Sequence, residues 1–143
     1  MGLFDFLKPK KRTLYDRMME DPAVQQQQEI FNLQSKMCAG GCETDELPNA
    51  SGEFGHTATN PIPTKTVFGS TVYLARLRAP DGAKVVYKRR CSLSCEVSNR
   101  PIDAYDIFHP DGRHLTTLYV SPYQLRNSHK APSGLHLIEP PPT

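Results

Sequence analysis

Two similar stretches carry the strongest structural signal in this chain: Val72-Tyr-Leu-Ala-Arg-Leu-Arg-Ala-Pro-Asp-Gly-Ala-Lys-Val-Val-Tyr-Lys88 and Ala104-Tyr-Asp-Ile-Phe-His-Pro-Asp-Gly-Arg-His-Leu-Thr-Thr-Leu-Tyr-Val120. In each stretch a Pro-Asp-Gly unit separates two runs that are rich in β-branched and aromatic residues. Proline presets the entry to a turn and glycine supplies positive φ, so each unit predicts a hairpin. We therefore expect four antiparallel strands, at residues 72–78, 84–88, 104–108 and 115–120.

Two helices are predicted before these strands. Thr13 and Asp16 have the spacing of a capping box, which predicts a helix over residues 14–20. Asp21-Pro22 is typical of an N-cap followed by a first helical residue, and the second helix is expected over residues 22–37. A sheet needs cover on one face. The expected fold is therefore α+β, with the N-terminal helical segment packed on a four-stranded antiparallel sheet and with long irregular loops.

The length and composition suit one small domain. The chain has 143 residues and 13 prolines. We expect a basic and apolar arm over residues 1–12, a single α+β domain over residues 13–138 and a disordered tail over residues 139–143. No apolar run approaches the roughly 18 residues of a membrane span, and no secretory signal is recognised, so we expect a cytoplasmic protein. The arm's mixed character also suits peripheral contact with an anionic membrane.

Four cysteines form the most specific chemical pattern. They stand in two Cys-x3-Cys loops, made by Cys38, Cys42, Cys91 and Cys95. Together the two loops would supply four thiolates, which is the ligand set of a closed structural zinc site. The alternatives are free thiols that behave as small hydrophobes, and disulfides within each loop, Cys38–Cys42 or Cys91–Cys95.

Histidines and aspartates gather around the second predicted turn. His109 and His114 flank it, and Asp103, Asp106 and Asp111 are near in sequence. Three such ligands around an open position would suit a metal-dependent hydrolase or nuclease. The alternative is that Asp111 builds the turn and the histidines are surface residues. No nucleophile motif or phosphate-binding glycine loop indicates an enzyme.

Basic residues also follow the first predicted hairpin. A strip of positive side chains with an interleaved tyrosine would suit single-stranded nucleic acid; it consists of Arg76, Arg78, Lys84, Tyr87, Lys88, Arg89 and Arg90. Strand alternation would divide the strip between two faces, however, and charges on an exposed strand are ordinary protection against aggregation. The net charge of +2 does not indicate nucleic acid either.

Several short motifs together resemble a known family. They are Thr59-Asn-Pro-Ile-Pro63, Pro101-Ile-Asp-Ala-Tyr105, and Ser121-Pro-Tyr123 followed by Ser128 and Ala131-Pro132. The series resembles a family of small uncharacterised bacterial proteins that share it over residues 38 to 138. The resemblance implies a bacterial, intracellular, single-domain protein. That family has no established activity, so the resemblance implies no catalytic residues.

These observations favour a binding role over catalysis. We expect a non-enzymatic bacterial interaction module whose partner is another protein. Its recognition surface is expected on two irregular segments, residues 43–66 and residues 121–134, because loops held on a rigid sheet commonly carry binding residues.

Overall fold

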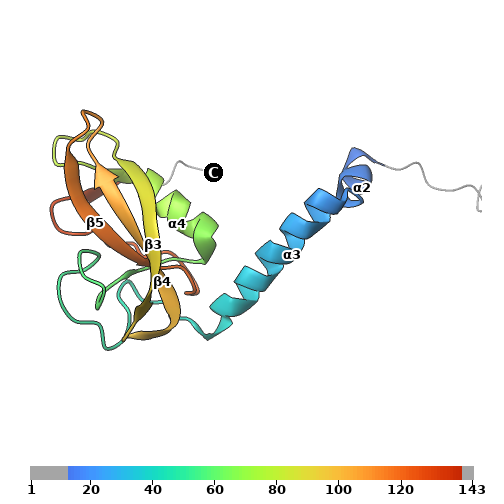
Figure 1. Cartoon of the computed structure of the whole chain (residues 1–143), viewed down its shortest axis with the longest axis horizontal. Coiled ribbons are helices and arrows are strands. Elements are labelled where there is room, and N and C mark those ends of the chain that lie inside the picture. The colour runs from blue at the N-terminus through green and yellow to red at the C-terminus, as the bar shows by residue number, and fades with distance from the viewer. Residues whose placement is uncertain (1–12, 140–143) are drawn as a thin grey trace, which may run out of the picture. The chain divides into compact units, whose positions relative to one another are not determined.

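The computed structural model describes residues 13–139 (Figure 1). The predicted arm over residues 1–12 lies outside the described residues, as does the predicted tail from residue 140 onward. The chain divides into two compact units, Met1–Leu33 and Gln34–Thr143, and each is described by itself.

The two predicted N-terminal helices are confirmed. Helix α2 (Leu14–Met19) begins at a complete capping box, in which Thr13 and Asp16 each accept the other's backbone N–H at 3.1 Å. Helix α3 (Pro22–Met37) begins where the Asp21 carboxylate accepts the Ala23 N–H at 2.9 Å. No side chain of α3 is buried. The start of helix α3 is therefore set by local capping and not by burial of an apolar face.

The second unit contains a four-stranded sheet. Strands β3 (Val86–Cys95), β4 (Ser98–Phe108) and β5 (His114–Ser121) form an antiparallel meander, and the sheet order is β1-β5-β4-β3. Strand β1 (Ile62–Pro63) pairs with β5 in parallel. The α+β class is confirmed, but the prediction of a purely antiparallel sheet is wrong. Residues 62–63 run beside β5 in the same direction, and the prolines on both sides of Ile62 limit β1 to two residues.

The predicted strand over residues 72–78 is wrong, because most of it is helical. Helix α4 (Thr66–Ala75) is followed by the two-residue strand β2 (Leu77–Arg78), which pairs with β6 (His136–Leu137) in a separate small sheet. Side chains at positions 66, 70, 73 and 74 of α4 are buried, and these follow the period of a helix. Burial of one helical face therefore outweighs the strand preference of Val72 and Tyr73.

The two Pro-Asp-Gly units both form turns. The second joins β4 to β5, as predicted. The first is closed by a bond from Ala79 N to Ala83 O and by an isolated bridge between Arg78 and Lys84, so it does not join two strands of the main sheet. Strand β4 instead forms its N-terminal hairpin with β3, through a turn at residues 96–97. This hairpin was not predicted.

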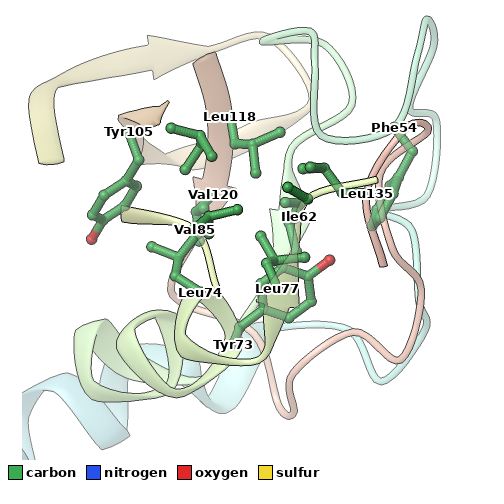
Figure 2. Close-up of a cluster of buried hydrophobic side chains, with 12 residues drawn as sticks. Phe54, Ile62, Tyr73, Leu74, Leu77, Val85, Tyr105, Leu118, Val120 and Leu135 are labelled. Carbon is green, nitrogen blue, oxygen red and sulfur yellow. The ribbon is translucent and has the colours of Figure 1, made fainter. Parts of the chain in front are cut away.

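The core lies between α4 and one face of the sheet. Figure 2 shows Tyr73 and Leu74 of α4 directed toward side chains of β1 and β5, among them Ile62, Leu118 and Val120. All five side chains are fully buried. The N-terminal helical segment was predicted to pack on this sheet, and that packing stays a prediction. Helix α4 covers this face of the sheet, because Tyr73 and Leu74 on its apolar side are fully buried in the core.

Candidate functional site

The motifs behind the family resemblance lie close together. Thr64, next to the first motif, donates its N–H to the Ser121 carbonyl and accepts the Gln124 N–H through its own carbonyl, both at 2.9 Å. The Ser128 N–H reaches the Pro63 carbonyl at 2.8 Å. The second motif lies on the neighbouring strand, where Asp103 is the register partner of Val120. Segments far apart in sequence therefore meet along the short parallel strand β1.

The two predicted recognition segments are bonded to each other. The Asp45 carboxylate accepts Arg126 Nη1 at 3.0 Å and the His129 N–H at 2.9 Å, and the Ser128 hydroxyl donates to the Asp45 carbonyl at 2.8 Å. The His129 N–H, with the Arg126 guanidinium beside it, lowers the pKa of Asp45. Residues 43–66 and 121–134 therefore form one ordered surface.

A second carboxylate, that of Glu46, also bonds residues 43–66 to residues 121–134. Glu46 accepts the side-chain amide of Asn60 at 2.9 Å and the Lys130 ammonium at 3.2 Å. These two donors lower the pKa of Glu46, with the Asn60 amide making the larger contribution.

A glycine permits the closest backbone approach at this surface. A Cβ on Gly41 would lie 2.5 Å from both the Tyr123 carbonyl oxygen and the Gln124 Cα, so no other residue fits there without backbone movement. The Gln124 side chain accepts the Cys42 N–H at 2.7 Å and donates to the Ser121 hydroxyl at 3.0 Å. Residues 41–42 are thereby held against residues 121–124.

A cavity opens beside this contact, within the second unit. Its volume is about 590 Å³, a size that suits small ligands or part of a peptide. Five short segments line it: residues 36–37, 40–42, 47–49, 97–100 and 123–124. The wall therefore combines the end of α3, the loop after it, the β3–β4 turn and the start of the segment after β5.

The chemistry of this wall favours binding. Met37, Leu47, Val97 and Tyr123 supply apolar surface, and Lys36 and Arg100 supply positive charge. The lining contains no histidine and no carboxylate, and Cys42 is its only nucleophilic thiol. A thiol needs an adjacent base to act as an efficient nucleophile. The cavity wall therefore has groups that recognise a ligand but lacks a nucleophile–base pair.

The four cysteines of the predicted zinc site occupy different environments. Cys38 is buried with its thiol 3.6 Å from the Pro122 carbonyl, while the Cys95 thiol lies 3.2 Å from the Ala58 carbonyl. Cys42 is half-buried and Cys91 is exposed, and all four are free thiols. Among residues 13–139, no three cysteine, histidine or acidic side chains lie in a group suited to a metal ion. The zinc site stays a prediction that this geometry does not strengthen.

The histidines and aspartates around the second turn have structural partners. Asp111 accepts the Arg113 N–H at 2.9 Å and so builds its turn. His109 Nδ1 faces the Asp111 N–H at 3.1 Å and Nε2 lies 2.8 Å from the Asp81 carboxylate. Through these contacts the His109 ring links the two Pro-Asp-Gly turns.

The remaining members of that cluster point elsewhere. Asp103 is buried and pairs with Arg89 at 2.9 Å, an interaction that raises the pKa of the guanidinium. Asp106 accepts the Thr117 hydroxyl at 2.9 Å and lies 3.5 Å from His114. The cluster predicted for a hydrolase is thus divided among three separate sets of contacts.

Most arginines of the predicted nucleic-acid strip are engaged by the protein itself. Arg89 pairs with Asp103, and Arg90 lies 3.8 Å from Asp106. Arg76 donates to the Ile138 carbonyl and Arg78 to carbonyls at the end of α4. The ion pairs of Arg89 and Arg90 reduce the positive charge that the strip offers to a phosphate backbone.

The cavity was not predicted from the sequence. Its wall depends on the β3–β4 turn, and residues 96–100 contain no glycine and no Asn-Gly or Pro-Asp pair that would announce a turn. The one available signal was the pair Gly40-Gly41 after α3, which was interpreted as a helix end and also permits close backbone contact.

Comparison of the chain with protein-family models, with curated proteins and with solved structures finds no match in any of the three. No helix in the described part of the chain has the length and apolarity needed to cross a bilayer.

Proposed function

We propose that this chain is a non-enzymatic interaction module that binds another protein through the cavity and the surface around it. The observation that carries the proposal is the cavity of about 590 Å³, lined by apolar groups and by two cations but by no catalytic pair. Concave, mostly preformed sites with a few polar groups are where ligands usually bind.

The rigidity of the surrounding loops supports this proposal. Asp45 and Glu46 fasten residues 43–66 to residues 121–134, and Gln124 fastens the backbone at Cys42. Binding sites held in place before the partner arrives lose less entropy on binding. We propose further that the module works in the cytoplasm of a bacterium, as the motif resemblance implies.

A fragment screen followed by NMR tests the proposal without knowledge of the partner. A collection of small anionic, cationic and neutral fragments is added to the full chain, and amide shift changes are mapped. We expect fragments to cluster at residues 40–49, 97–100 and 123–124, because binding energy concentrates in preformed concave sites.

A matched pair of variants gives the control. Asn99→Trp places a large side chain in the cavity wall, whereas Ser94→Trp places the same side chain at an exposed position outside it. Asn99→Trp should abolish the fragment shifts and Ser94→Trp should preserve them. Fragments that bind both variants equally, or that cluster elsewhere, would contradict the proposed site.

A further inference from the structure

The cavity wall has an uncompensated positive charge. Lys36 and Arg100 both line it, and neither side chain takes part in an ion pair with any other described residue. This is unlike Arg126 and Lys130 on the same surface, which pair with Asp45 and Glu46. The sequence neighbours Glu43 and Glu96 do not belong to the lining. The cavity therefore offers its charge to an anion.

Arg100 makes a carboxylate a suitable anion. A guanidinium presents paired N–H groups in a plane that matches the two oxygens of a carboxylate, and such charge-assisted bonds are stronger than neutral ones. Arg100 stands at the start of β4, one residue before Pro101, and its own backbone N–H is bonded to the Ser98 hydroxyl at 3.2 Å. Its backbone is thus fixed at the rim of the cavity. Lys36 supplies a second, more flexible positive charge.

The rest of the wall suits an apolar chain next to that carboxylate. Leu47 is buried, and Met37, Val97 and the Tyr123 ring complete an apolar surface. The side-chain amides of Asn49 and Asn99 and the Ser98 hydroxyl offer hydrogen bonds to a peptide backbone. A single aromatic ring and two cations are few for nucleic acid, whose binding usually needs a row of both.

We infer that the cavity binds an acidic peptide segment of the partner, with a carboxylate at Arg100 and Lys36 and adjacent apolar side chains against Leu47, Val97 and Tyr123. This inference rests on the proposed function and names the chemistry of the partner.

Three pools of capped five-residue peptides test the inference. Every peptide is acetylated and amidated and has apolar residues around a central Glu, Gln or Lys. Binding to the full chain is measured by NMR titration. The Glu pool should bind at residues 97–100 and 123–124 with a Kd about tenfold below that of the isosteric Gln pool, and the Lys pool should bind more weakly still.

Charge variants locate the recognition. Arg100→Gln should weaken the Glu pool about tenfold and remove its advantage over the Gln pool, and Lys36→Gln should have a smaller effect in the same direction. Lys88→Gln removes one positive charge from an exposed position outside the cavity and is the matched control. It should leave binding unchanged. Denaturation curves that coincide for the three variants show that the fold is intact.

Failure of this inference is distinguishable from failure of the proposed function. Equal binding of the Glu and Gln pools at the cavity, or an unchanged Kd in Arg100→Gln, would overturn the acidic-segment inference and leave the binding module standing. If none of the three peptide pools binds while the neutral fragments still bind the cavity, the acidic-segment inference is likewise overturned and the binding module stands. Failure of pools and fragments alike would overturn both.

Discussion

The two Pro-Asp-Gly turns are nearly identical in their internal bonds but differ in what surrounds them. Gly82 and Gly112 both have positive φ, at 88° and 99°. In each turn the aspartate accepts the N–H two residues later, at 3.0 Å for Asp81 and 2.9 Å for Asp111. The first turn follows a helix and a two-residue strand, whereas the second joins two long strands. Turn geometry is therefore local, while the elements on either side are chosen by burial.

The largest expected effect tests whether residues 72–75, which precede the first turn, form a helix or a strand. The side chains of Leu74 in α4 and Ile107 in β4 are fully buried in the core, with 0% of their surface exposed to solvent. Val72 is 39% exposed. Leu74→Ala and Ile107→Ala should each lower the free energy of unfolding by about 2–5 kcal/mol, because each leaves a cavity in the core. Val72→Ala should change it by less than about 0.5 kcal/mol.

Urea denaturation measures all three variants. In a surface strand, positions 72 and 74 would share one face and respond alike. Equal effects at those two positions would therefore contradict the helix, whatever the result at Ile107.

An intermediate effect is expected at the turn glycines. A Cβ at Gly82 or Gly112 would meet no atom within 4 Å, so the cost of Gly→Ala there is the cost of positive φ alone. Each substitution should destabilise the protein by about 1–2 kcal/mol, and the two losses should be similar. Thermal denaturation measures them.

Gly40→Ala is the control for this pair. Its Cβ would also meet no atom within 4 Å, but its φ is outside the left-handed region. It should be neutral or slightly stabilising. A large difference between Gly82→Ala and Gly112→Ala would mean that the flanking elements do alter the turns.

The smallest expected effect concerns acid stability. The Ala83 N–H, helped by His109, lowers the pKa of Asp81 from its ordinary 3.8, and the Arg113 N–H and guanidinium do the same for Asp111. A lowered folded pKa stabilises the protein above the unfolded value, and this contribution is lost as the pH falls through the folded pKa. Asp81→Asn and Asp111→Asn should therefore each reduce the dependence of stability on pH below about 4.

Carboxyl NMR titration checks the cause directly. His109→Gln should raise the pKa of Asp81 toward its ordinary value without fully restoring it, because the Ala83 N–H remains. If the pKa of Asp81 equals its ordinary value of 3.8 in the native protein, the contact between His109 and Asp81 makes no electrostatic contribution to stability.

The contrast between local turn geometry and burial of the flanking elements explains how much of the fold could be predicted from the sequence. Features set within a few residues were predictable: the capping box of Thr13 and Asp16, the N-cap at Asp21 and both turns. Residues 72–78 were not, because their β-branched and aromatic side chains suit a strand equally well and only the core determines which face is buried.

The cavity depends still more on distant contacts. Arg100 and Lys36 are 64 positions apart in the chain, and no local pattern connects them. The two segments predicted as a recognition surface were identified by their irregular composition, and their mutual bonds through Asp45 depend on tertiary structure.

Strand β1 also affects how copies of this protein can associate. On its outer side the Pro63 carbonyl is already bonded to Ser128, and Pro61 and Pro63 have no N–H to donate. Within residues 13–139, the long border strand of this sheet is β3, with ten residues, whereas β1 has two. Addition of a strand from another molecule to this sheet is therefore expected at β3 and not at β1.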